Sequence, residues 1–232
     1  MRSRWIPIIG LSLVAAGLLT AIVFIAVGEE GPVPPVSGSD TVQRIYGGID
    51  QDEDTLGDPG APVTITVFND LQCTPCGDWH LETIPPLIDD LVRDGDAKLE
   101  FRHRAVGARV VTEAALGAEA AGEQGFEWQF IHLVFLNLDQ VEISGTDEQQ
   151  SDQFLERVAA AIPSPEFNEG RWEKDRESME EEFVSQVESD DQEAIEHGIA
   201  SPGVVVDGPD GEVILRESPS ADEIEAAVAE VR

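Results

Sequence analysis

The sequence predicts an α/β fold in which a strand–helix–strand unit and a strand–strand–helix unit are separated by a long helical block. Three observations support this order. Runs rich in β-branched residues occur in the first half of the chain and again after residue 200. Between them, apolar residues recur at the spacing of amphipathic helices. Near the C-terminus, Asp207–Gly211 is a turn motif between two apolar runs and predicts an antiparallel hairpin.

The first unit lies around the two cysteines. Val63–Phe68 is rich in β-branched residues and predicts a strand. From Cys73 to about Val92, apolar residues fall at helical spacing, and Pro85 and Pro86 should kink this helix. Lys98–Val106 predicts a second strand, and a right-handed crossover would place it parallel to the first.

The rest of the domain follows in the same way. The helical block is predicted at about residues 107–197, where alanine-rich and amphipathic stretches follow one another. Val204–Val206 and Val213–Leu215 predict the two strands of the hairpin, and Asp222–Val231 predicts a closing amphipathic helix. We therefore expect one domain over residues 45–232.

The N-terminal residues predict a membrane anchor. Residues 5–27 are almost wholly apolar, and a helix of that length reaches about 34 Å, enough to cross the core of a bilayer. Arg2 and Arg4 precede this run, so the positive-inside rule keeps residues 1–4 in the cytoplasm and exports the remainder. The alternative is a cleaved signal peptide, whose apolar core is normally shorter, about 7–15 residues.

Both interpretations place the domain outside the cytoplasm, where disulfides persist. A single-pass protein of the cell membrane, with its domain on the extracytoplasmic side, is the prediction. Residues 28–44 are rich in glycine, proline and serine, and we expect them to form a flexible linker between anchor and domain.

The composition excludes some partners. The chain has 47 acidic and 14 basic residues and a formal net charge of -33. Such a surface repels the phosphates of nucleic acids and anionic lipid headgroups, so neither is expected as a partner. Hydrophobic residues make up 41% of the chain, which is enough for an ordinary globular core.

The two cysteines, Cys73 and Cys76, are too few for a disulfide scaffold but have the spacing of a redox pair. At the start of a helix, unpaired backbone N–H groups and the helix dipole favour a thiolate, which lowers the pKa of the first cysteine below its free value of about 8.5. Such a thiolate attacks a disulfide, or departs as the leaving group when a substrate thiol attacks its own disulfide. The second cysteine resolves the mixed disulfide. Pro75 lacks an N–H and should tune the stabilisation of the Cys73 thiolate.

The cysteine pair has two other possible interpretations, a zinc site and a structural bridge. A zinc site with Cys73, Cys76 and His80 would need a fourth ligand, and no second cysteine pair exists to supply it. A structural bridge between residues three apart would close a very small loop and stabilise little. We expect no metal and no cofactor, and we interpret His80 as a partly exposed helical histidine. We interpret three tryptophans as packing aromatics or surface caps and not as a cofactor site: Trp79, Trp128 and Trp172.

At these residues the sequence resembles the DsbA-like, thioredoxin-fold oxidoreductases of bacterial and archaeal envelopes. The similarity is spread over about Tyr46–Val231 and does not rest on one motif. The stretches that carry it are Gly57–Ile65 (GDPGAPVTI), Phe68–Cys76 (FNDLQCTPC), Phe101–His103, Ala118–Gly125 with Trp128, and Gly198–Gly203.

The resemblance implies a thioredoxin-like fold with a helical insertion and a cis peptide bond before Pro202, beside the cysteine pair. The backbone of Ser201 would then pair with an extended substrate, which we also expect to contact Thr74 and Pro75. One departure concerns Val67, which stands where family members often carry an acidic residue that helps to move a proton to the second cysteine.

The predicted function is a membrane-anchored, extracytoplasmic thiol–disulfide oxidoreductase. It would oxidise cysteine pairs of unfolded or reduced exported proteins through a Cys73–Cys76 disulfide, and a membrane redox partner would reoxidise it. Two alternatives stay open. One is an envelope reductase or isomerase, for example in cytochrome c maturation, and the other is a non-redox binding or chaperone module of the same fold.

Overall fold

The structure is a computed structural model that describes residues 35–104, 112–139 and 148–232. Within these ranges the predicted α/β class with a helical insertion is confirmed. The predicted cytoplasmic tail and anchor, residues 1–27, lie outside the described residues. Among the helices that the structure describes, none is both long and apolar enough to cross a membrane.

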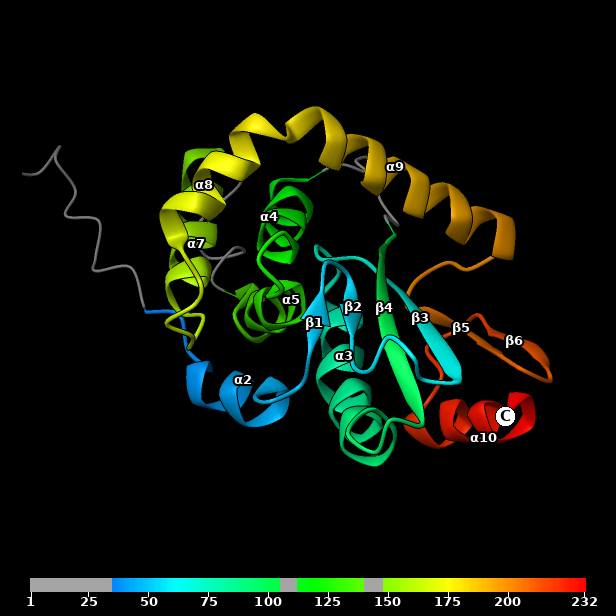
Figure 1. Cartoon of the computed structure of the whole chain (residues 1–232). Helices are drawn as coiled ribbons and strands as arrows, with labels where there is room; N and C mark the ends of the chain where they lie inside the picture. The colour runs from blue at the N-terminus through cyan, green and yellow to red at the C-terminus, as the bar shows by residue number, and fades with distance from the viewer. Residues whose placement is uncertain (1–34, 105–111, 140–147) are drawn as a thin grey trace, which may run out of the picture. The chain divides into compact units, whose positions relative to one another are not determined.

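A six-stranded mixed sheet forms the centre of the domain, in the order β1-β2-β4-β3-β5-β6 (Figure 1). The two central strands are parallel, with Val67 opposite Phe101, and β5 is antiparallel to β3, with Phe68 opposite Gly203. The predicted hairpin is present as β5 and β6. The strands are β1 (Gln51–Asp52), β2 (Thr55–Leu56), β3 (Val63–Asn69), β4 (Ala97–His103), β5 (Gly203–Gly208) and β6 (Gly211–Leu215).

Helices cover both faces of this sheet (Figure 1). Because side chains alternate along a strand, Ile65 and Val67 of β3 face the main core with α3 and α10, whereas Phe68 packs with Ala194 of α9 on the other face. The helices are α2 (Ser39–Tyr46), α3 (Thr74–Leu87), α4 (Glu113–Gly122), α5 (Glu127–Leu136), α7 (Glu148–Ala160), α8 (Glu169–Ser178), α9 (Glu180–His197) and α10 (Ala221–Val231).

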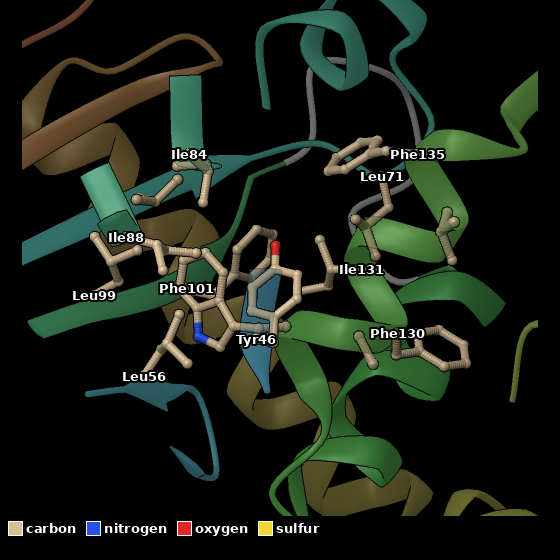
Figure 2. Packing of buried hydrophobic residues seen from close by; sticks show 14 of the residues in the cluster. Tyr46, Leu56, Leu71, Ile84, Ile88, Leu99, Phe101, Phe130, Ile131 and Phe135 are labelled. Carbon is tan, nitrogen blue, oxygen red and sulfur yellow. The ribbon is translucent and has the colours of Figure 1, made fainter. Parts of the chain in front are cut away.

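The insertion joins the main core through α4 and α5. Trp128, Phe130 and Ile131 are fully buried and belong to the same cluster as the strand residues Leu99 and Phe101. Figure 2 shows Phe101, Phe130 and Ile131 among the residues of this cluster. The helical insertion is therefore packed into the domain and shares its hydrophobic core.

The prediction of a flexible linker over residues 28–44 is wrong for residues 39–44, because Ser39–Tyr46 form helix α2. Val42 and Tyr46 lie four residues apart on the buried face of this helix, with side chains 0% and 1% exposed. The Tyr46 hydroxyl is 3.0 Å from His132 Nδ1 on α5. Packing against the insertion thus makes a helix of residues that were predicted to be part of a flexible linker because the surrounding stretch is rich in glycine and proline.

The acidic run before the first central strand contains a hairpin that the sequence patterns did not predict. β1 and β2 are two residues long, and β2 extends the sheet by pairing with β4, Leu56 opposite Leu99. The connecting residue Asp54 accepts a hydrogen bond from Trp128 Nε1 through its backbone carbonyl, at 2.8 Å. Strands this short carry almost no periodicity, so only the tertiary contacts define them.

The two prolines of α3 lie near its end, where the helix changes its pitch. Pro85 and Pro86 lie within α3, and the helical pitch changes after Leu87 to a π-helix over Ile88–Val92, labelled η1. Proline removes a backbone donor from the helical ladder, and such a change of pitch is one way a helix accommodates the loss. The predicted irregularity near the prolines is therefore present.

Candidate active site

Cys73 and Cys76 form a disulfide at the start of α3, with their Cα atoms 5.1 Å apart. Cys73 is the N-cap residue of the helix and is partly exposed, whereas Cys76 lies in the first turn and is 2% exposed. One sulfur therefore faces solvent and the other faces the protein. This asymmetry suits an attacking thiol at Cys73 and a resolving thiol at Cys76.

The backbone before the helix fixes the position of Cys73. Asp70 closes a turn after β3: its side chain accepts from Gln72 N at 2.9 Å and its carbonyl accepts from Cys73 N at 3.2 Å. The backbone N–H of Cys76 points back to Cys73 Sγ at 3.3 Å. A negative charge on that sulfur would be stabilised by this N–H and by the helix dipole.

The loop before β5 lies against the buried cysteine. The predicted cis peptide bond joins Ser201 and Pro202. Ser201 Oγ lies 3.7 Å from Cys76 Sγ and 3.4 Å from Asn69 Oδ1, so its one hydroxyl proton can be directed to either acceptor. The structure thus brings Ser201 and Pro202 to the cysteine pair, while Thr74 and Pro75 are exposed on the first turn of α3.

Asn69 belongs to this site although the sequence patterns did not single it out. It ends β3, is completely buried, and donates from Nδ2 to the carbonyl of Cys76 at 3.3 Å. Through Oδ1 it can accept from Ser201 and from the backbone N–H of Asp70. The signal that could have found it is an amide at the carboxyl end of a central strand, immediately before the cysteine loop.

Val67 leaves no acidic group at the position where the resembling family often has one. Its side chain is fully buried between Phe101 on β4 and Val204 on β5. A proton for Cys76 therefore has no carboxylate source at residue 67. Among the described residues, the Ser201 hydroxyl lies beside the Cys76 sulfur, and the Asn69 amide donates to the Cys76 backbone carbonyl.

The interpretation of His80 as a partly exposed residue is wrong, since its ring is fully buried one turn beyond Cys76. It packs against Phe135, His132 and Trp128, with ring centroids 4.9, 5.6 and 6.2 Å away. Neither ring nitrogen has a hydrogen-bond partner in the described part of the chain. Burial, followed by the nearby His132, lowers the pKa of His80 well below its usual value. The cause of this burial is α5, which covers that face of α3.

The three tryptophans of the described residues are packing aromatics, the first of the two predicted roles. Each is buried and donates its indole N–H to a backbone carbonyl: Trp79 to Pro219, Trp128 to Asp54 and Trp172 to Gly117, at 2.7, 2.8 and 2.7 Å. These hydrogen bonds satisfy the polar end of each ring.

Gly77, directly after Cys76, allows α5 to approach the active-site helix. A Cβ at this position would lie 2.8 Å from Phe135 Cδ1 and 3.1 Å from Leu138 Cδ1. We expect Gly77→Ala to lower the free energy of unfolding by about 1–2 kcal/mol, because overpacking outweighs the roughly 1 kcal/mol that alanine gains over glycine in a helix. Denaturant unfolding measures this.

The matched control for that prediction is Gly170→Ala in α8, where the nearest atom to a Cβ would be Asn168 Oδ1 at an ordinary 3.5 Å. This variant should be as stable as the unchanged chain or slightly more so. Equal stabilisation by both substitutions would show that the approach of α5 to α3 does not depend on the missing side chain.

A cysteine pair that caps a helix, beside a cis-proline loop on a βαβ–ββα sheet, defines the thioredoxin-fold class of dithiol–disulfide proteins. A sequence model of the thioredoxin family matches residues 50–230, and the chain belongs to that family. Its cysteine pair is intact and disulfide-bonded, as thiol–disulfide exchange requires. No curated protein sequence matches the chain.

Solved structures of similar fold include several oxidoreductases. Oxidised BdbD from Bacillus subtilis is 22% identical with a TM-score of 0.61, covering 78% of this chain and 96% of BdbD. DsbA from Chlamydia trachomatis is 22% identical with a TM-score of 0.60, covering 77% and 91% of the two chains. MdbA, a thiol-disulfide oxidoreductase from Corynebacterium diphtheriae, is 18% identical with a TM-score of 0.54, covering 71% and 87%. At these identities the likeness supports the fold.

Proposed function

We propose that this chain is an oxidase that passes the Cys73–Cys76 disulfide to cysteine pairs of reduced exported proteins. The observation that carries the proposal is the arrangement of the pair, with Cys73 partly exposed at the helix end and Cys76 buried beside Ser201. An incoming thiolate can reach the first sulfur but not the second. Burial of Cys76 therefore determines that the substrate attacks the sulfur of Cys73.

The reaction balances as two thiol–disulfide exchanges. A substrate thiolate attacks Cys73 Sγ, which forms a mixed disulfide and releases Cys76 as a thiolate. The second substrate thiolate then attacks the substrate sulfur of that mixed disulfide and releases Cys73 as a thiolate. The substrate is oxidised by two electrons, and the reduced pair requires a disulfide or quinone oxidant, which we assign to a membrane redox partner.

The released thiolates explain why the polar groups around the pair matter. Cys73 gains its stabilisation from the N-terminus of α3, and the Ser201 hydroxyl can turn its proton from Asn69 toward the Cys76 sulfur. An extended substrate would lie along Ser201 and Pro202 and contact the exposed Thr74 and Pro75. A stabilised thiolate is a good leaving group, which favours donation of the disulfide.

Equilibration with glutathione tests the direction. We expect the Cys73–Cys76 disulfide to be a stronger oxidant than the glutathione pair, so that a moderate excess of reduced glutathione reduces the protein almost fully. Quantifying reduced and oxidised protein after thiol labelling gives the equilibrium constant, where about 30 mV corresponds to a tenfold change. A potential far below that of glutathione would favour the reductase and contradict the oxidase.

We also propose that residues 5–27 anchor the protein in the cell membrane and that residues 1–4 stay in the cytoplasm. The apolar run of sufficient length and the preceding Arg2 and Arg4 support this arrangement. N-terminal sequencing of the mature protein tests it. A mature chain that begins near residue 29 would identify a cleaved signal peptide and exclude the anchor.

A further inference from the structure

An acidic pocket of about 140 Å³ lies between the β1–β2 turn and helices α4, α5 and α9, apart from the residues that hold the cysteine pair. Its lining includes Asp54, Glu119, Glu127 and Asp190. Arg102 is a nearby cation, and its guanidinium is already shared among Asp54, Glu100, Asp190 and Glu193.

Three potential ligand atoms converge beside this pocket from three different elements. His103 ends β4, Glu119 lies on α4 and Glu127 begins α5, and one nitrogen or oxygen from each lies within 4.8 Å of the other two. His103 Nε2 is 3.2 Å from Glu119 Oε1 and 3.8 Å from Glu127 Oε1. Two ligands of one tetrahedral or octahedral ion, each about 2.1 Å from it, lie about 3.0–3.5 Å apart, close to these separations.

Two of these atoms are buried without the hydrogen bonds that burial normally requires. His103 and Glu127 are 4% and 2% exposed, and neither His103 Nε2 nor Glu127 Oε1 has a hydrogen-bond partner among the described residues. An unsatisfied buried nitrogen or carboxylate oxygen is costly. A bound cation would remove that cost.

We propose that His103, Glu119 and Glu127 bind one divalent transition-metal ion such as Mn²⁺ or Zn²⁺. One imidazole nitrogen and two carboxylates neutralise such an ion, and the nitrogen favours Mn²⁺ or Zn²⁺ over Ca²⁺ or Mg²⁺, which prefer oxygen ligands alone. The ion would join the end of the central strand β4 to two helices of the insertion. Its role is therefore to stabilise the junction between the sheet and the insertion.

The test uses the full chain in detergent, stripped of metal by chelation, with the Cys73–Cys76 disulfide intact so that free thiolates do not compete for the ion. In molar NaCl, which screens unspecific attraction to a chain of charge -33, Mn²⁺ or Zn²⁺ should bind with a stoichiometry of one by calorimetry and raise the melting temperature. Glu127→Gln and His103→Gln should each weaken this affinity at least tenfold.

A second readout separates loss of the site from loss of the fold. Without metal, Glu127→Gln should melt at the same temperature as the unchanged chain or higher, because it removes a buried charge. Glu182→Gln, an exposed position on the lining of the same pocket, should keep the full metal affinity. Equal affinity in all variants, no saturable binding, or stabilisation by Ca²⁺ that survives His103→Gln would each overturn the assignment.

Discussion

Cys73→Ser should reduce the disulfide-exchange activity to the uncatalysed background, whereas Cys76→Ser should trap a mixed disulfide with the substrate protein. The reason is the difference in exposure between the two sulfurs, since a substrate thiol can form a bond only with the partly exposed Cys73. Without Cys76, no internal thiol resolves that bond. Non-reducing gel electrophoresis after incubation with an unfolded, disulfide-bonded protein measures both outcomes, because the Cys73 thiolate of Cys76→Ser then attacks a substrate disulfide and releases a substrate thiolate.

No other cysteine can complicate this experiment, because the chain contains two cysteines in all. Any adduct of Cys76→Ser must therefore involve Cys73, and it should disappear when a reducing agent is added. Trapping by Cys73→Ser in place of Cys76→Ser would reverse the assignment of attacking and resolving sulfur. Full biological function in Cys73→Ser would instead favour a non-redox binding module.

Acidification from pH 7.5 to pH 5 should remove about 2 kcal/mol of stability through His132 alone. Burial lowers the pKa of His132 to about 4, compared with 6.5 in the unfolded chain. Its contribution is therefore complete above pH 6.5 and is lost as the pH falls toward 4, because the unfolded state takes up a proton that the folded state refuses. Denaturant unfolding across this range in molar salt measures the effect.

The comparison that isolates this contribution is between the unchanged chain and His132→Asn. Burial raises the pKa of Asp190 to about 6, which acts in the opposite direction and adds stability on acidification, but it does so in both chains. His132→Asn should therefore lose about 2 kcal/mol less between the two pH values. His197→Asn, at a partly exposed position, is the control and should run parallel to the unchanged chain. Parallel curves for all three would exclude His132 as an acid-sensitive group.

The sequence predicted those strands, helices and turns that are determined by residues close together in the chain. Val63–Asn69 is a strand because of its β-branched residues, α3 begins at the cysteine pair, and the hairpin turns at Asp207–Gly211. The prediction failed where a long-range contact outweighed the local pattern. The segment 39–46 is a helix because Val42 and Tyr46 find partners in the core, and β2 is a strand because β4 offers it an edge.

The residues of the candidate site also fall into two groups, those predicted from sequence and those found only in the tertiary structure. Spacing and helix position alone identified Cys73 and Cys76, whereas the cis bond before Pro202 was implied by the resemblance to the DsbA-like family. Asn69 entered the site only when the end of β3 met the Ser201 loop, 132 residues further along the chain.

The sequence by itself determined the order of the central strands and of the helices between and after them, and the chemistry of the cysteine pair, because periodicity, turn residues and the Cys-x-x-Cys spacing act over a few neighbouring residues. The tertiary structure decided which of the two sulfurs is exposed, that His80 is enclosed, and that His103, Glu119 and Glu127 converge. Burial and convergence depend on the packing of segments far apart in the chain, which local sequence patterns do not encode.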